Sequence, residues 1–172
     1  MKPPFVIWFT GLSSSGKTTL SKNLHSTFEK EVVSLVLLDG DDIRTAFGED
    51  LGHGQDDRFT QIRRIQNISK ILVDQGISVI VAALYANEEL LLWNRKYLKN
   101  YFEIYLQASI KTVMSRDTKN LYAPAINGNL KNVVGVDIGY DDPKSPDIII
   151  DMDRPNNVSD TIRHLTDRIN LS

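Results

Sequence analysis

The feature that most constrains this chain is the stretch GLSSSGKT at residues 11–18, which satisfies the pattern G-x-x-x-x-G-K-[ST]. It follows an apolar run at 5–10 and opens a helical pattern at 17–30, so the expected arrangement is a strand, a tight loop and a helix. Glycines let such a loop curl until its backbone N–H groups point at phosphate oxygens, and the helix N-terminus adds partial positive charge. A Gly/Ser turn without a ligand is the alternative, but this context favours a phosphate-binding loop.

Individual positions of the loop have expected roles if a nucleoside triphosphate binds. Lys17 is expected to reach the β- and γ-phosphates and to take part in catalysis, and the hydroxyl of Thr18 is expected to ligate Mg²⁺. ATP and Mg²⁺ are therefore the expected cofactors. The residues expected to bind ATP in this part of the chain are Gly11, Ser13, Ser14, Ser15, Gly16, Lys17, Thr18 and Thr19.

Apolar runs without alternation are separated along the chain by segments of helical periodicity. This pattern predicts a parallel sheet with helices on both faces, an α/β fold of the three-layer P-loop NTPase type, in one domain spanning 1–172. Segment 117–147 is rich in Asn, Gly, Pro and Asp, which is typical of a lid or binding loop. Strands are expected at 5–10, 32–38, 78–84, 101–106 and 148–150, and helices at 17–30, 56–75 (ended by Gly76), 87–100, 109–116 and about 158–169 (capped by Asn157 or Ser159).

Composition narrows the class of protein further. The formal net charge of −2 gives no sign of a polyanion-binding surface, so no nucleic-acid partner is expected. The chain has no cysteine, which excludes disulfides, thiolate metal sites and thiol catalysis. No apolar run approaches the roughly 18 residues of a membrane span, and the first apolar run is too short for a signal peptide. The expectation is a cytoplasmic protein with no membrane partner.

Carboxylates follow the second expected strand, in the stretch LLDGDDIR. The carboxyl ends of parallel strands share one edge of the sheet, so Asp39 and Asp41 are expected close to the phosphates, where a carboxylate holds a cation or accepts a proton. The alternative is that Asp41 or Asp42 only caps a short following helix, which is the favoured interpretation for Asp42. Of the arginines that follow, Arg58 lies at a helix entrance and is the best candidate to bind an anion. Arg63 and Arg64 diverge on that helix, so the three arginines cannot serve one ligand.

Several segments together resemble the adenylylsulfate kinase family, and the likeness covers nearly the whole chain. GLSSSGKTTL is similar to the family's phosphate loop, LDGDDIR to its Asp-Gly-Asp segment, and DLGHGQDDRFTQIRRI to its acceptor-binding helix. RDTKNLY and NLKNVVGVD are similar to its lid, and SPDIIID to its closing strand. These segments together are far more specific than a phosphate loop alone.

The resemblance implies a kinase of the nucleoside-monophosphate-kinase type, which moves the γ-phosphoryl group of ATP to the 3′-hydroxyl of a nucleotide acceptor with Mg²⁺. It implies that Asp39 is the catalytic base or the magnesium partner near that hydroxyl, and that Asp41 supports it. It also implies a cytoplasmic enzyme that forms a homodimer in many members. The remaining roles that it implies are binding of the acceptor's 5′ anion by Arg44 and Arg58, closure over ATP by Arg116 and Lys119, and contact with the acceptor by Lys131.

The departures from the family pattern all fall on the acceptor side. Two phenylalanines that sandwich the acceptor adenine in the family correspond to His53 and Val133, an asparagine corresponds to Gln61, and an Ile-Ser-Pro-aromatic-Arg run corresponds to AALYAN at 82–87. Stacking a base on an aromatic ring contributes about 1–3 kcal/mol, so adenine binding is expected to weaken. A known relative phosphorylates cytidine diphosphoramidate for capsule biosynthesis, and a smaller, more polar pocket suits that acceptor. Adenylylsulfate is the alternative acceptor.

Three other classes of function compete with a nucleotide 3′-kinase. A nucleotide-binding switch or ATPase module is the non-kinase alternative, but the Asn-Lys-x-Asp pattern of GTPases is absent. A small-metabolite kinase on the same fold is disfavoured by the lid segments quoted above. A catalytically inactive interaction protein is disfavoured because Lys17, Thr18 and Asp39 are all present.

Overall fold

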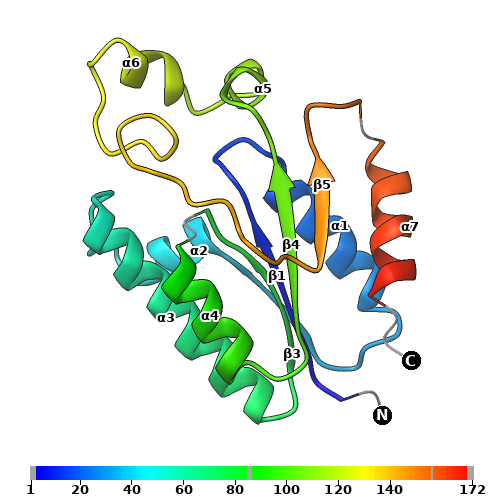
Figure 1. Cartoon of the computed structure of the whole chain (residues 1–172). Helices are drawn as coiled ribbons and strands as arrows, with labels where there is room; N and C mark the ends of the chain where they lie inside the picture. The colour runs from blue at the N-terminus through cyan, green and yellow to red at the C-terminus, as the bar shows by residue number, and fades with distance from the viewer. Residues whose placement is uncertain (1–2, 85–86, 156, 170–172) are drawn as a thin grey trace.

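A five-stranded parallel sheet forms the centre of the protein in a computed structural model that describes residues 3–84, 87–155 and 157–169. The strand order is β2-β3-β1-β4-β5, so the first strand lies in the middle (Figure 1). The strands are β1 (Val6–Thr10), β2 (Leu35–Asp39), β3 (Ser78–Ala82), β4 (Tyr101–Gln107) and β5 (Ile148–Asp151). The helices are α1 (Lys17–Phe28), α2 (Gly40–Ala46), α3 (Gln55–Asp74), α4 (Glu88–Tyr97), α5 (Ile110–Ser115), α6 (Tyr122–Ile126) and α7 (Val158–Arg168).

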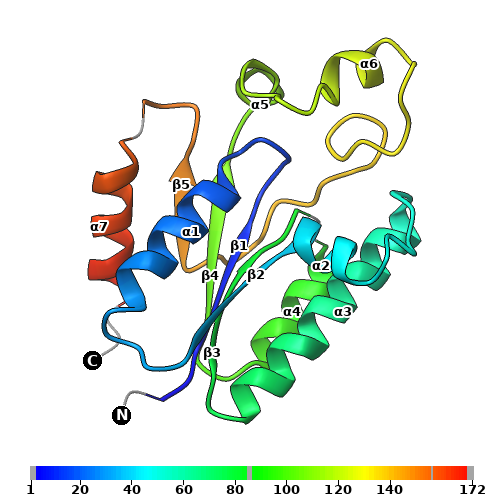
Figure 2. The same ribbon diagram turned by 180° about the vertical axis from the view of Figure 1, so that it is seen from behind.

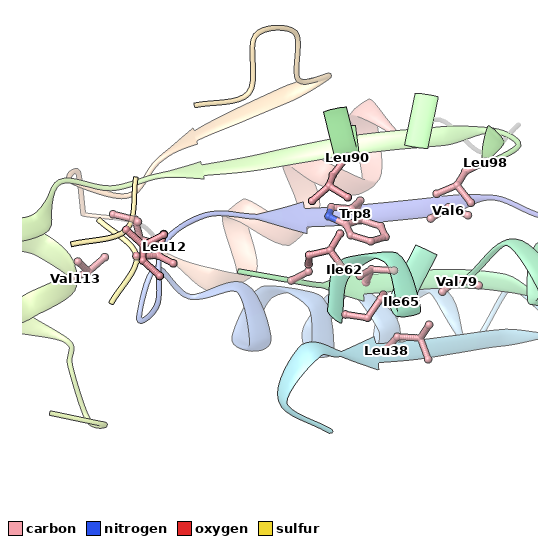
Figure 3. Close-up of a cluster of buried hydrophobic side chains, with 14 of the residues drawn as sticks. Val6, Trp8, Leu12, Leu38, Ile62, Ile65, Val79, Leu90, Leu98 and Val113 are labelled. Carbon is pink, nitrogen blue, oxygen red and sulfur yellow. The ribbon is translucent and has the colours of Figure 1, made fainter. Parts of the chain in front are cut away.

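Helices cover both faces of the sheet, which confirms the three-layer P-loop NTPase fold. One face packs on α1 and α7 and the other on α3 and α4, as the two opposite views show (Figures 1 and 2). Successive side chains of β1 point to opposite faces, so Trp8 packs in the cluster under α3 and α4, and Ile7 in the cluster under α1 and α7. Figure 3 shows Trp8 between Leu90 and Ile62, and only 1% of Trp8 is exposed. Every residue of β1 is buried, which explains its unalternating sequence.

Most expected elements are confirmed, with differences at their ends. The second strand was expected from residue 32, but β2 begins at Leu35 and Val33 is 92% exposed. The first residues of this apolar run therefore lie outside the sheet. The third strand ends at Ala82, and helix α4 ends at Tyr97 because Leu98 is extended. Gly76, in the left-handed region at φ 86°, follows the end of α3 as expected. Of the two caps considered for α7, Asn157 is the observed one.

The segment 117–147, here called the lid segment, was expected to lack regular structure but contains the short helix α6. Asp117 supports the start of this helix, because its Oδ2 accepts hydrogen bonds from the backbone N–H groups of Leu121 (2.6 Å) and Tyr122 (2.9 Å). Buried lid residues belong to the same apolar cluster as the sheet under α3 and α4, and Leu12 of the phosphate loop joins them. The lid segment therefore packs on the phosphate loop. No helix within the described residues is long and apolar enough to cross a membrane.

Candidate active site

A cavity of about 670 Å³ lies at the carboxyl ends of β1, β2 and β3, between the phosphate loop, α2, the start of α3 and the lid segment. Of the residues predicted to bind or act on a substrate, all but Gly11 and Ser15 line this cavity. Those that line it are Ser13, Ser14, Gly16, Lys17, Thr18, Thr19, Asp39, Asp41, Arg44, His53, Arg58, Gln61, Arg116, Lys119, Lys131 and Val133. Residues from five separate parts of the chain thus meet at one place, as the parallel-sheet argument requires.

The phosphate loop curls around the amine of Lys17. Lys17 Nζ donates hydrogen bonds to the carbonyl oxygens of Gly11 (2.9 Å) and Leu12 (2.7 Å). A Cβ on Gly11 would stand 2.7 Å from the carbonyl oxygen of Leu106, and Gly16 has φ 103°, so both positions require glycine. Ser15 is fully buried, and its hydroxyl has no hydrogen-bond partner among the described residues. Burial lowers the pKa of Lys17 to about 8, although Asp39 and Asp41 act to raise it.

This lowered pKa predicts a pH-dependent affinity for ATP. Above pH 8 the free amine of Lys17 is mostly neutral, so binding of the phosphates has to restore its proton, and the Kd for ATP should rise by up to about tenfold per pH unit. Below pH 7 the amine is already charged, and this contribution to the Kd should be flat. Titration of ATP binding from pH 6.5 to 9.5 measures the effect. A Lys17→Arg variant is the control, because arginine stays charged throughout. The prediction is contradicted if the Kd of the wild type for ATP changes with pH no more than that of the Lys17→Arg variant.

The pair Thr18 and Asp39 lies at the floor of the cavity. Thr18 Oγ1 donates a hydrogen bond to Asp39 Oδ2 (2.7 Å), while Asp39 Oδ1 accepts from the backbone N–H of Asp41 (3.0 Å). Asp39 is therefore the N-cap of α2, which corrects the favoured interpretation of Asp42 as a cap and excludes the same alternative for Asp41. A hydroxyl and a carboxylate side by side fit Mg²⁺, which prefers oxygen ligands and takes few of them from the protein. No group of three or more His, Cys, Asp or Glu side chains within the described ranges could hold a metal ion.

Two cationic residues on the lid side of the cavity, Arg116 and Lys119, have partners in other segments of the chain. Lys119 forms an ion pair with Asp41, which ties the lid segment to α2. Burial acts to raise the pKa of Asp41, but the hydrogen bond and charge of Lys119 outweigh it and hold that pKa below its usual value. Arg116 donates a hydrogen bond to the carbonyl oxygen of Met152 (2.9 Å). Both Arg116 and Lys119 line the cavity, where the sequence placed them against ATP.

The arginines predicted for the acceptor's anion hold backbone carbonyl groups in this structure. Arg44 Nη1 donates to the carbonyl oxygens of Leu51 (2.7 Å) and Gly52 (2.9 Å). Arg58 donates through Nε to the carbonyl oxygen of His53 (2.8 Å) and through Nη2 to that of Asn132 (2.8 Å). Burial lowers the pKa of His53, and the charges of Arg44 and Arg58 lower it further. Both arginines line the cavity, and a guanidinium is suited to bind an anion there.

The amide of Gln61 has a defined orientation in the cavity wall. Its Nε2 donates to the carbonyl oxygen of Gly40 (3.1 Å), and its Oε1 accepts from Arg64 Nη1 (3.3 Å). Arg64 also forms an ion pair with Asp50, whereas Arg63 pairs with Glu89. Neither Arg63 nor Arg64 lines the cavity, which agrees with the expectation that the three arginines do not serve one ligand.

Other residues that shape the cavity were not predicted from the sequence. Tyr122 is fully buried, and its hydroxyl donates to the carbonyl oxygen of Ser13 (3.0 Å), so α6 is fixed to the phosphate loop. One tyrosine in a polar segment is the only signal of this contact in the sequence. The other unpredicted lining residues are Gly40, Ile62, Ile65, Ala82, Ala83, Leu84, Thr118, Leu121, Leu130, Asn132 and Val134. Three of the AALYAN residues are among them, whereas Tyr85 and Ala86 lie outside the described residues.

The chain is similar to kinases across most of its length. A family model described as adenylylsulphate kinase matches residues 3–151. The chain is 38% identical over 168 residues to the cytidine diphosphoramidate kinase of Campylobacter jejuni, covering 98% of both chains. It is 39% identical over 148 residues to the adenylyl-sulfate kinase of Prochlorococcus marinus, covering 85% of this chain and 74% of that one. Its structure resembles that of the Mycobacterium tuberculosis APS kinase CysC in complex with AMPPNP and APS, with a TM-score of 0.88, 29% identity, and coverage of 98% and 99%.

Proposed function

Because the chain belongs to the adenylylsulfate kinase family, we propose that this kinase transfers the γ-phosphoryl group of ATP to the 3′-hydroxyl of cytidine diphosphoramidate. The observation that carries the choice of acceptor is the wall of the cavity that His53 and Val133 form. These two residues stand where the adenylylsulfate kinase family has the two phenylalanines that stack on adenine. Val133 is only 6% exposed and has no ring to stack on a purine. The full-length similarity to the Campylobacter jejuni enzyme supports the same acceptor.

The residues of the cavity have complementary tasks in this proposal. The phosphate loop and Lys17 bind the phosphates of ATP, and Lys17 balances the negative charge of the transferred group. Asp39 receives the proton of the attacking 3′-hydroxyl. Mg²⁺, held by Thr18 and Asp39, would supply further charge neutralisation at the phosphate oxygens. Arg116 and Lys119 bind ATP from the lid side, and the packed lid segment excludes water that would otherwise receive the phosphoryl group.

The acceptor side is assigned by the same reasoning. Arg44 and Arg58, which both line the cavity, bind the 5′ anion of the acceptor. Asp41 supports Asp39. The nucleobase of the acceptor lies against His53 and Val133. Gln61 and Lys131 make further contacts with the acceptor.

The proposed location of the enzyme is the cytoplasm, where ATP is available, and its proposed place is in capsule biosynthesis. The proposed assembly is a homodimer, which analytical ultracentrifugation tests.

Adenylylsulfate is the second candidate acceptor, with 3′-phosphoadenylylsulfate as its product. Two findings favour it: adenylyl-sulfate kinases are 36–39% identical to this chain, and the similar Mycobacterium tuberculosis structure contains APS. Membership in a family of kinases weighs against the non-kinase alternative of a nucleotide switch.

An acceptor assay tests the proposal. The protein is incubated with ATP, Mg²⁺ and either cytidine diphosphoramidate or adenylylsulfate, and the phosphorylated product is identified by mass. Loss of aromatic stacking on a purine predicts that kcat/KM for cytidine diphosphoramidate is higher by about tenfold or more. The Lys17→Ala variant, purified in the same way, controls for contaminating kinases. A higher kcat/KM for adenylylsulfate would overturn the choice of acceptor. Release of ADP from ATP at the same rate with and without an acceptor nucleotide would overturn the kinase proposal itself.

A further inference from the structure

The lid loop, here residues 131–138, is folded around the carboxylate of Asp137. This carboxylate accepts hydrogen bonds from two consecutive backbone N–H groups, those of Asn132 (2.7 Å) and Val133 (2.6 Å). The N–H groups of residues 136, 137 and 138 in turn donate to the carbonyl oxygen of Val133. Asn132 has φ 66°, a left-handed conformation that is rare outside glycine. Asp137 thus stabilises the turn, because its carboxylate accepts hydrogen bonds from the backbone N–H groups of Asn132 and Val133.

This turn presents the carbonyl group of Asn132 to Arg58. Arg58 Nη2 donates to that carbonyl oxygen (2.8 Å) across a separation of 74 residues, and Arg58 Nε donates to the carbonyl oxygen of His53 (2.8 Å). In both views the chain after α6 lies above the beginning of α3 (Figures 1 and 2). One guanidinium therefore joins the segment that carries His53 to the segment that carries Val133, and both of these side chains line the cavity.

We propose that Asp137 is a positioning residue for the acceptor: by fixing the Asn132 carbonyl on Arg58, it sets the distance between the His53 and Val133 walls of the cavity. Asp137 itself does not line the cavity, so it acts through the backbone of the lid loop. This inference rests on the proposed function in one respect, namely that the acceptor's base occupies the space between these two walls. It applies equally to a cytidine or an adenylyl acceptor.

Replacement of Asp137 by asparagine separates this role from general stability. An asparagine keeps the size of the side chain but has one acceptor oxygen in place of two, so at least one of the two N–H groups loses its partner. A wall that is no longer fixed should weaken binding of the acceptor but leave the phosphate loop, which Tyr122 holds separately, unchanged. Weakened charge-assisted hydrogen bonds predict a KM for the acceptor that rises about tenfold and a KM for ATP that stays within about twofold.

The experiment compares the Asp137→Asn and Asp141→Asn variants by steady-state kinetics with whichever acceptor the wild type phosphorylates. Asp141 is exposed, lies in the same segment and does not line the cavity, so its variant removes the same charge and should match the wild type. A third variant, Arg58→Lys, is combined with Asp137→Asn. If Asp137 acts through Arg58, the double variant should have nearly the acceptor KM of the Arg58→Lys variant alone, because the two changes break one linkage.

Backbone amide hydrogen exchange of residues 132 and 133 gives a readout that needs no acceptor. Faster exchange there in Asp137→Asn, with the rest of the chain unchanged, is the expected result and shows that Asp137 holds the turn even if the acceptor differs from the proposed one. The inference is overturned if exchange is unchanged, if the KM for ATP rises as much as the KM for the acceptor, or if the effects of the Asp137 and Arg58 variants multiply. An unexpected acceptor in the wild-type assay would overturn the proposed function instead.

Discussion

Substitution of Lys17 by alanine is expected to lower kcat/KM by about a thousandfold or more with any acceptor, since catalysis of phosphoryl transfer depends almost entirely on positioning and charge stabilisation. Nζ of Lys17 is the cation enclosed by the phosphate loop, bonded to two of its carbonyl groups. Alanine removes the charge, and it also removes the two hydrogen bonds that shape the loop. Both effects act on the transferred phosphoryl group, so no compensation by a different acceptor is expected.

A coupled assay of ADP release measures this loss, with thermal unfolding to establish that the variant is folded. The matched control is Lys22→Ala on the exposed face of the same helix, α1, which should retain wild-type kcat/KM. A Lys17→Ala protein with a melting temperature near that of the wild type and more than a tenth of its activity would show that the phosphate loop does not bind the reacting group.

The sequence predicted the central architecture because its signals are local. The phosphate loop is eight consecutive residues, and the buried strands are continuous apolar runs whose burial on both faces removes any alternation. The cavity followed from topology alone, since parallel strands bring their carboxyl ends to one edge. Thus Asp39 could be assigned to the same cavity as Lys17 and Thr18, although Asp39 lies 21 residues after Thr18 in the sequence.

Contacts that bridge distant segments could not be predicted in this way. The bond from Tyr122 to the phosphate loop spans 109 residues and that from Arg58 to Asn132 spans 74. No periodicity encodes either contact, because each depends on where an irregular segment crosses the sheet edge. The cap of α2 was missed for a related reason: Asp39 was considered mainly as a group facing substrate, whereas one of its oxygens also accepts from the N–H of Asp41.

The Asp39→Asn variant is expected to lower kcat by about a hundredfold to ten-thousandfold, the range associated with loss of a general base, while the KM for ATP changes by a few-fold. Asparagine is as good an N-cap as aspartate, so α2 should keep its position. Its one acceptor oxygen can keep the bond from the N–H of Asp41, and its amide N–H can donate to Thr18 Oγ1 in place of the bond that Thr18 now donates, which limits the disturbance of the phosphate loop. What it lacks is the charge needed to take the proton of the 3′-hydroxyl.

Asp42→Asn is the matched control, because Asp42 is exposed in the same helix and does not line the cavity. Single-turnover kinetics with saturating ATP and acceptor separate the chemical step from product release. If kcat stays within a few-fold of the wild type, Asp39 is not the base, and the proton leaves by another route. If binding of ATP with Mg²⁺ is lost instead, the main task of Asp39 is to hold the metal beside Thr18. A fall in kcat alone assigns the proton to Asp39, because the cap survives the substitution, the amide can still bond Thr18 with the direction reversed, and the basic carboxylate is gone.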